Sequence, residues 1–260
     1  ISSPAGDESA VEESAVDWPA ITLLHRSFAD VANGQRPATI DGIIADLGVS
    51  SLQLGDPERG FSFQAEGPLD MRMNPMSGET AEQVVNHIDE RELADVIYEF
   101  GEERRSRRIA RAIVRSRPIR STAHLADVIS AAARPMNSES RRIHPATRTF
   151  QALRIFVNRE LDDLRALLEA VPRILKPGGR VVVISFHSLE DRIVKDAFRE
   201  GAKQGYFSLL TKKPVTATKE ESDRNPRARS AKLRAAEKVS SGKPAGVPGT
   251  AVMACRAFRF

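Results

Sequence analysis

Cysteine is almost absent from this sequence, which contains a single one, Cys255, among 260 residues. One cysteine excludes an internal disulfide framework and any cysteine-based zinc site, and it fits a reducing compartment. We expect no metal site, and we expect Cys255 to be a buried strand residue. The disulfide-rich secreted class of proteins is therefore excluded.

Long apolar runs and glycine-rich phosphate loops are absent as well. No stretch approaches the roughly 20 apolar residues of a membrane span, no signal-peptide pattern opens the chain, and no Gly-x-Gly-x-x-Gly motif occurs. The hydrophobic content of 41% is nevertheless sufficient for a core. The length suits one large domain, or one domain with a smaller insertion, so we expect a soluble protein without a membrane partner.

Charge is unevenly distributed, although the net charge is only +4. Residues 1–17 carry acidic side chains and no basic ones, and we interpret this stretch as a loop of a longer parent. Three basic clusters together favour a polyanionic partner, whereas each one alone also fits a solvated helix face. The clusters are the arginines Arg104, Arg105, Arg107, Arg108, Arg111, Arg115, Arg117 and Arg120, then Arg141, Arg142 and Arg148, and finally the tail 203–243.

Apolar runs and helical periodicity alternate along the chain. Short apolar or β-branched runs predict strands, and apolar residues at three- and four-residue steps predict helices. We expect one long helix from Thr147 to Leu175, because Pro177 cannot continue it. The expected strands are 21–24, 40–46, 180–186 and 252–260, and the other expected helices are 81–100, 102–115 and 188–201, with Ser188 as the cap.

This alternation predicts an α/β fold with a mainly parallel sheet, whose ligands lie at the carboxyl ends of the strands. Asp46 and the segment 186–188 then belong to that edge. The roughly hundred residues before Thr147 are too many for a connection, so we read 79–145 as a small helical insertion. The expected domain parts are 1–78, 79–145 and 146–260, and we expect 216–229 to be a mobile loop.

Several motifs together are similar to one family. They are Asp-Leu-Gly-Val-Ser-Ser-Leu-Gln at 46–53, the segments 59–63 and 67–73, the stretch from His144 to Asn158, Ser-Phe-His-Ser-Leu-Glu-Asp-Arg at 185–192, and Asn-Pro-Arg-Ala-Arg-Ser-Ala-Lys-Leu-Arg at 225–234. In this combination the chain resembles the ribosomal RNA small-subunit methyltransferase H family, also called MraW. The resemblance covers nearly everything from Phe28 to Glu237.

The resemblance implies a Rossmann-like class I methyltransferase that uses S-adenosylmethionine to methylate N4 of a cytidine in the decoding region of 16S ribosomal RNA. The implied partner is small-subunit ribosomal RNA or the assembling small subunit, and the implied address is the bacterial cytoplasm, with an organellar homologue as the alternative. Implied cofactor contacts are Phe28, Asp46 and Gln53. The family's first glycine-rich loop is expected to precede Ile1, so we expect this chain alone to bind the cofactor weakly or not at all.

Methyl transfer to an exocyclic amine needs an acceptor for the proton that the nitrogen loses. The Asn/Asp-Pro-Pro-aromatic motif that often serves amino-methyltransferases is absent. Candidate acceptors at the strand edge are Asp46, Ser185 and His187. His187 fits equally well as a helix-entry residue whose ring is already hydrogen-bonded.

RNA contacts are expected from a basic run near the end of the chain, which comprises Arg227, Arg229, Lys232 and Arg234. These cations suit phosphate contacts, although a solvated helix would show the same pattern. Two other classes stay open at this point. One is a non-catalytic assembly factor that binds ribosomal RNA, and the other is a Rossmann-type enzyme that acts on a small molecule.

Salt dependence separates an RNA-binding protein from a small-molecule enzyme. We expect affinity for a small-subunit ribosomal RNA fragment to fall about tenfold or more between about 50 and 200 mM salt, because released counterions drive phosphate binding. Fluorescence anisotropy of a labelled fragment at several salt concentrations measures the slope. A flat slope would favour the small-molecule enzyme.

Overall fold

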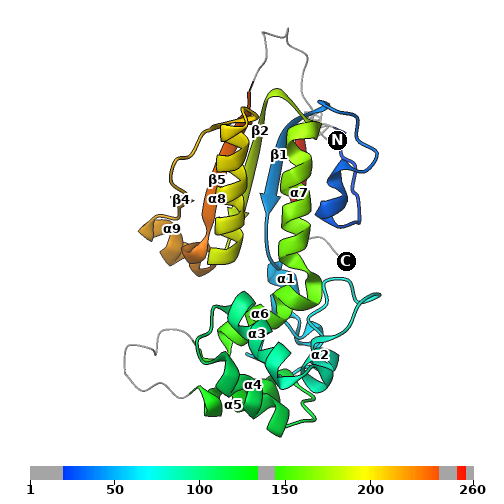
Figure 1. Cartoon of the computed structure of the whole chain (residues 1–260), viewed down its shortest axis with the longest axis vertical. Coiled ribbons are helices and arrows are strands. Elements are labelled where there is room, and N and C mark those ends of the chain that lie inside the picture. The colour runs from blue at the N-terminus through cyan, green and yellow to red at the C-terminus, as the bar shows by residue number, and fades with distance from the viewer. Residues whose placement is uncertain (1–19, 134–143, 240–250, 256–260) are drawn as a thin grey trace, which may run out of the picture.

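The computed structural model describes residues 20–133 and 144–239, and the backbone of the strand at 251–255. Two lobes are visible in Figure 1: a sheet lobe, and a helical lobe that lies beyond the carboxyl end of the strand β1. No helix among these described residues is long and apolar enough to cross a membrane.

The sheet is mixed, with its parallel strands at the centre. β1 pairs in parallel with β2 on one side and with β6 on the other, and the remaining pairs are antiparallel. The predicted α/β class and the strand at 40–46 are confirmed, and Cys255 does end a strand. The strand order is β3-β5-β2-β1-β6, with β4 paired to β5, and the bounds are β1 Ile40–Asp46, β2 Leu175–Ser185, β3 Phe207–Leu209, β4 Val215–Thr216, β5 Lys232–Lys238 and β6 Ala251–Cys255.

The strand expected at 21–24 is not formed. Ile21, Leu23 and Leu24 lie in an irregular segment and are 72%, 84% and 59% exposed. Both edges of the central strand β1 are already taken by β2 and β6, so this segment has no place beside it. A run of four apolar residues is too short to show a periodicity, so the sequence could not distinguish a strand from an irregular segment here.

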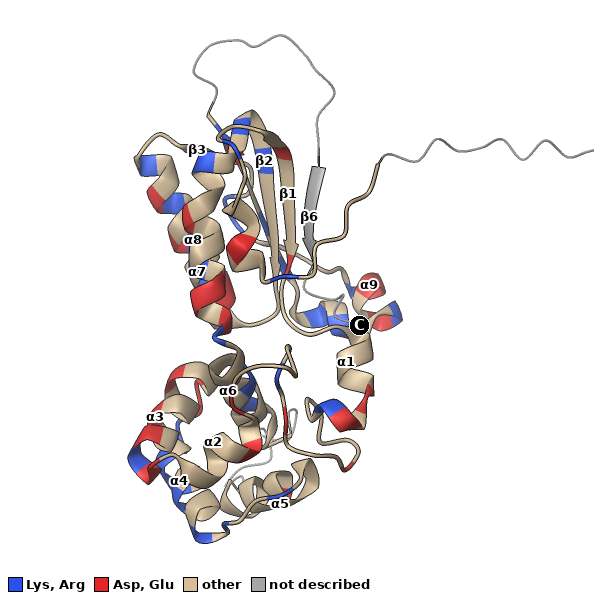
Figure 2. Ribbon diagram, turned by 90° about the vertical axis from the view of Figure 1, so that its right-hand side faces the viewer, with Lys and Arg blue, Asp and Glu red and all other residues tan. Residues whose placement is uncertain are grey.

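Two helices cover one face of the sheet. α7 (Glu160–Ile174) and α8 (Ser188–Lys203) both lie on the same side of the strands in Figures 1 and 2. The short 3-10 helix η1 (Phe28–Ala32) packs beside α7. The apolar core between these layers includes Ile43, Val181, Val183, Leu164, Leu167, Val171 and Phe198.

The single long helix expected from Thr147 to Leu175 is instead two helices. α6 (Thr147–Asn158) ends at Arg159, which has a left-handed backbone with φ 50° and ψ 38°, and α7 begins at the next residue. The Asn158 side chain donates to Met71 O at 2.7 Å and accepts from Met73 N at 2.6 Å. These two hydrogen bonds tie the end of α6 to the segment that contains Met71 and Met73. The next helix, α7, packs on the sheet instead.

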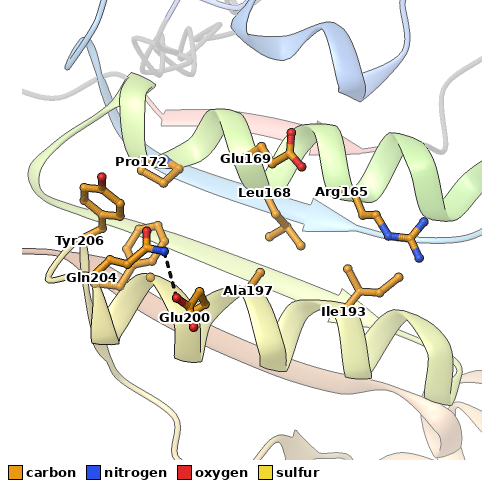
Figure 3. Close-up of a pocket in the computed structure, with 11 residues that line it drawn as sticks. Arg165, Leu168, Glu169, Pro172, Ile193, Ala197, Glu200, Gln204 and Tyr206 are labelled. Atoms are coloured by element: carbon orange, nitrogen blue, oxygen red, sulfur yellow. Dashed lines mark hydrogen bonds between the residues drawn. The ribbon is translucent and has the colours of Figure 1, made fainter.

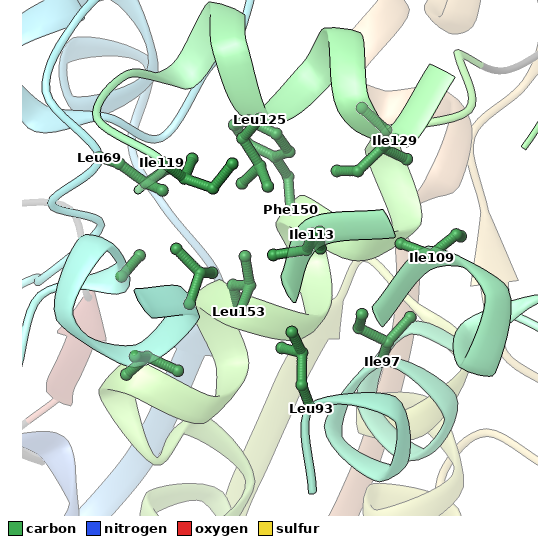
Figure 4. Packing of buried hydrophobic residues seen from close by; sticks show 14 of the residues in the cluster. Leu69, Leu93, Ile97, Ile109, Ile113, Ile119, Leu125, Ile129, Phe150 and Leu153 are labelled. Atoms are coloured by element: carbon green, nitrogen blue, oxygen red, sulfur yellow. The ribbon is translucent and has the colours of Figure 1, made fainter. Parts of the chain in front are cut away.

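The helical lobe has a core of its own (Figure 4). Its apolar residues come from the helices and from the segment 61–73, so its packing draws on residues on both sides of the 79–145 segment. Leu93, Ile97, Ile113 and Leu153 are fully buried. The helices are α2 (Ala81–His87), α3 (Glu90–Gly101), α4 (Ser106–Arg115), α5 (Thr122–Ala132) and α6.

Three local predictions are corrected. The loop expected at 216–229 contains the helix α9 (Lys219–Arg224) and the 3-10 helix η4 (Pro226–Ser230), which are capped by the side chains of Thr218 and Asn225. β2 begins at Leu175, with an irregularity in its register before Arg180. The cap of α8 is His187, not Ser188. Side-chain capping supplies order here that polarity alone did not predict.

Leu153→Ala should destabilise the helical lobe. Removing a fully buried leucine side chain leaves a cavity, which lowers the free energy of unfolding by about 2 to 5 kcal/mol. Urea denaturation followed by circular dichroism measures the loss. Leu52→Ala is the matched control, because Leu52 is 72% exposed, and should change stability by less than about 0.5 kcal/mol. Equal losses in both variants would contradict the assigned core.

Candidate functional site

The carboxyl ends of β1 and β2 lie side by side. Asp46 is paired with Ile184 in the parallel register, and Leu47 N donates to Ile184 O at 3.0 Å. An added Cβ at Gly48 would lie 3.8 Å from the Phe186 ring. The structure therefore brings the chain at Asp46 next to the segment Ser185–His187, as the alternation of strands and helices predicts.

Asp46 carries a buried carboxylate oxygen, Oδ1, for which the described residues provide no hydrogen-bond partner. Burial, and then the negative charge of Glu190, raise the pKa of Asp46 above its usual range. A buried oxygen without a hydrogen-bond partner lowers the stability of the fold unless a ligand or a water molecule donates a hydrogen bond to it. A carboxylate with a raised pKa is also a better proton acceptor.

Gln53 lies one turn into α1 (Ser51–Gly55), the helix that follows β1. Its side chain and that of Ser50 form a capping box, in which Ser50 N donates to Gln53 Oε1 at 3.0 Å and Gln53 N donates to Ser50 Oγ at 3.1 Å. Gln53 is only 4% exposed, and its Nε2 is buried without a partner among the described residues. It is therefore not a surface amide, and one of its donor groups is left without a protein partner among the described residues.

Ser185 is buried at the end of β2. Its hydroxyl donates to Lys232 O at 3.3 Å, across the antiparallel pairing of β2 with β5. The proton of Ser185 is therefore already used within the sheet. This contact favours a structural role for Ser185 over a role as proton acceptor.

His187 forms the N-cap of α8. Its Nδ1 accepts from Glu190 N at 3.4 Å, and its Nε2 lies 3.1 Å from Glu190 Oε1, although without the alignment of a hydrogen bond. Since Nδ1 acts as an acceptor, the ring proton belongs on Nε2 and faces the carboxylate. Of the two roles open from the sequence, the capping geometry favours the structural one.

Glu190 was not among the residues predicted for the site. Its carboxylate accepts from Phe186 N at 2.9 Å, and the residue is 2% exposed. Burial alone would raise the pKa of Glu190, but the close contact with the His187 ring and the charge of Arg154 outweigh burial and lower it. The three-residue spacing from His187 to Glu190 is that of a capping box, so the sequence held a signal for this contact.

Glu160, His187 and Glu190 bring three potential metal-ligand atoms within 4.8 Å of one another. Glu160 is 2% exposed, and both of its carboxylate oxygens accept from Arg154, at 2.9 and 3.1 Å. The guanidinium already neutralises this carboxylate. We therefore interpret the group as a buried ion-pair cluster that joins α6, α7 and α8.

Phe28 lies on η1, beside α7. The preceding Ser27 caps η1 and donates to Asp163 Oδ2 of α7 at 2.8 Å. The Phe28 ring packs against the core of the sheet lobe and is only partly buried. Its position therefore fits core packing at the margin of the sheet lobe.

The four basic residues predicted for RNA contact fall into two groups. Arg227 and Arg229 are exposed on η4, and Arg227 donates to Ser51 Oγ of α1. Lys232 begins β5 opposite Ser185 and lies 3.7 Å from Asp191 Oδ2. These three cations therefore lie beside the carboxyl edge of the sheet.

Arg234 differs from the other three because it is only 7% exposed. Its Nε and Nη2 donate to the two carboxylate oxygens of Asp191, at 2.7 and 3.2 Å. Burial alone would raise the pKa of Asp191, but Arg234, with the charges of Lys232 and Lys195, lowers it. A buried, bidentate guanidinium is not available to phosphate, so the geometry assigns Arg234 a structural role.

A hollow of about 340 Å³ lies elsewhere, between α7 and α8 (Figure 3). Its lining combines apolar side chains with a charged rim. It opens near the carboxyl-terminal half of α8, whereas His187 and Glu190 are at the amino-terminal end of that helix. The hollow is therefore separate from the strand edge, and its lining includes Arg165, Leu168, Pro172, Ile193, Ala197 and Tyr206.

Comparison with known proteins gives one consistent result. Residues 7–239 match the model of the MraW methylase family. A protein of Koribacter versatilis named ribosomal RNA small subunit methyltransferase H is 72% identical over 229 residues, which cover 88% of this chain and 73% of the relative. The protein of the same name from Acidobacterium capsulatum is 65% identical, with 87% and 75% covered, and that of Solibacter usitatus is 55% identical, with 81% and 72% covered.

Arg234→Met should lower stability because it removes the bidentate partner of the half-buried Asp191 carboxylate, which keeps only Lys232 nearby. The expected loss is about 1 to 3 kcal/mol at pH 7 in urea denaturation, less than for a fully buried pair because the carboxylate is partly solvated. Since the pKa of Asp191 is lowered in the folded state, the parent loses this stabilisation as pH falls below about 4, and the two proteins should converge there.

Arg227→Met is the control for this comparison, because Arg227 is exposed. It should change stability by less than about 0.5 kcal/mol. A loss as large as that of Arg234→Met would contradict the distinction between the two arginines.

Proposed function

Because this chain belongs to the MraW methylase family, whose members are class I methyltransferases, we propose that it methylates small-subunit ribosomal RNA with S-adenosylmethionine as the methyl donor. The proposed acceptor is the exocyclic N4 of a cytidine in the decoding region. The names of the relatives support the substrate class. The observation that carries the proposal is the unpartnered buried carboxylate oxygen of Asp46, at the edge where α/β folds bind their ligands.

Three residues are proposed to hold the cofactor. Asp46 Oδ1 and Gln53 Nε2 are an acceptor and a donor that are buried without partners among the described residues, which fits a polar ligand at the end of β1. Phe28 on η1 is proposed from the resemblance to the family, which places an aromatic ring there. When bound, S-adenosylmethionine supplies an electrophilic methyl group on its sulfonium sulfur.

Asp46 is our proposed proton acceptor. The lone pair of an exocyclic amine is delocalised into the base, so the nitrogen becomes nucleophilic only as it loses a proton. The raised pKa of Asp46 suits this role. Ser185 donates a hydrogen bond to Lys232 O, and His187 caps α8, so both are better suited to holding the strand ends in position.

RNA recognition is proposed at two surfaces. At the strand edge, Arg227, Arg229 and Lys232 are placed to contact phosphates that flank the target base, which must leave its stack to reach Asp46. The helical lobe is built mainly from the proposed insertion 79–145, between the proposed methyltransferase segments 1–78 and 146–260, and provides a second basic surface on α4 (Figure 2). The exposed arginines near and on α4 are Arg104, Arg107, Arg108, Arg111 and Arg115.

The proposed substrate implies a location in the cell. Ribosomal RNA and assembling subunits are found in the cytoplasm of bacteria, and the relatives with named organisms are bacterial. We therefore propose that the protein acts in the cytoplasm, with the small-subunit RNA or the assembling subunit as its partner.

Asp46→Asn should lower the rate of methyl transfer by about 100-fold or more, because the amide cannot accept the proton. The assay follows labelled methyl from S-adenosylmethionine into unmodified small subunits, and nucleoside analysis identifies the methylated atom. It is run on this chain and on a version lengthened at its N-terminus to the size of the relatives. Calorimetric titration with S-adenosylmethionine separates lost chemistry from lost cofactor binding.

Asp95→Asn, an exposed site on α3, is the matched control and should remain active. Activity of Asp46→Asn equal to that of the control would reject Asp46 as the acceptor. No label from a folded, RNA-binding parent would instead favour a non-catalytic assembly factor.

A further inference from the structure

We propose that Glu102 is a positioning residue, which ties the helical lobe to the start of α8 beside the strand edge. The inference rests on the proposed function, because the position of the helical lobe matters for catalysis only if that lobe helps to present RNA. Nothing in the motifs quoted above pointed to this residue. Its role follows from contacts between segments that are far apart in the chain.

The carboxylate of Glu102 bridges the two lobes. It accepts hydrogen bonds from Ser188 Oγ and from Arg192 Nη2, the latter at 3.0 Å. Ser188 is the first residue of α8 and directly follows His187. Glu102 is 86 residues from Ser188 in sequence, so a single side chain joins the end of α3 to the segment that follows β2.

The backbone holds Glu102 in a defined place. It caps the end of α3 in a left-handed conformation, with φ 48° and ψ 34°, which is uncommon for a residue other than glycine. At the preceding Gly101, an added Cβ would lie 2.7 Å from Arg148 O of α6. The end of α3 is therefore packed closely on α6. This packing restricts the backbone that carries the Glu102 side chain.

The charges around Glu102 favour the ionised carboxylate. The hydrogen bond from Ser188 lowers the pKa of Glu102, burial opposes this, and the hydrogen bond and charge of Arg192, with the charge of Arg148, lower it further. Glu102 should therefore be charged at neutral pH. A hydrogen bond to a charged acceptor is stronger than one between neutral groups.

Glu102 adds a further point of attachment between the lobes. The chain itself connects them twice, after β1 and at Arg159, and the ion pair of Arg154 with Glu160 lies across the second connection. Both of these attachments lie away from the end of α3. The bridge from Glu102 joins that end to the start of α8 and so restricts the angle between the lobes at a separate place.

Glu102→Gln should loosen the two lobes. The amide loses the charge that binds Arg192, so the distribution of distances between the lobes should widen. Methyl transfer should slow by about tenfold in kcat, because small displacements of a reacting group cost large factors in rate. The affinity for S-adenosylmethionine should stay unchanged, since its proposed contacts are all outside the helical lobe.

Glu99→Gln is the matched control, because Glu99 is exposed on the same helix. It should alter neither the distances nor kcat. Glu102→Asp keeps the charge on a shorter side chain and should recover part of the activity. Thermal melting of every variant checks that each one is folded.

The distances are measured by electron spin resonance on pairs of spin labels in the full chain. Asp95→Cys on α3 and Lys203→Cys on α8 carry the labels, in a background in which Cys255 is replaced by serine. Widening in Glu102→Gln, with the control unchanged, supports the bridge. An unchanged distribution, or an unchanged kcat in an active enzyme, overturns it.

The distance measurement needs no substrate, so its result is independent of the assay. Absence of methyl transfer in the parent would count against the proposed function, whereas an unchanged distance distribution would count against the bridge. The two failures are therefore distinguishable.

Discussion

Parallel pairing of β1 with β2 is the constraint on which the rest of the site depends. The register sets Asp46 opposite Ile184, so both strands end at the same edge of the sheet. The segments that follow the two strands therefore begin next to each other. From that edge the chain enters α1 on one side and α8 on the other. Residues more than a hundred positions apart thus meet because two strands share one direction and one register.

Buried charge at this edge is stabilised by partners rather than by solvent. Glu190 lies at the amino-terminal end of α8, where backbone N–H groups favour a carboxylate, and it also accepts from Phe186 N. Arg154 and Glu160 neutralise one another nearby. The negative charge that remains near Asp46 contributes to its raised pKa. Glu190, which takes part in the cap of α8, therefore also contributes to the raised pKa of Asp46.

A single polar side chain holds an irregular segment of the helical lobe in place. Asn158 clamps the segment around Met71, a buried residue with φ 59°, to the end of α6. A positive φ in such a residue is strained, so this segment is held by its surroundings.

Local apolar patterns and turn residues were sufficient to predict β1, the second half of β2, the body of α8 and the shared edge with Asp46. The sequence by itself could not determine the break at Arg159, because apolar periodicity continues across it. Nor could it determine the burial of Arg234, whose partner Asp191 is 43 residues away, or the bridge made by Glu102. Burial and long-range pairing depend on neighbours in three dimensions, so the structural roles of these charged residues follow from the folded chain and not from local patterns.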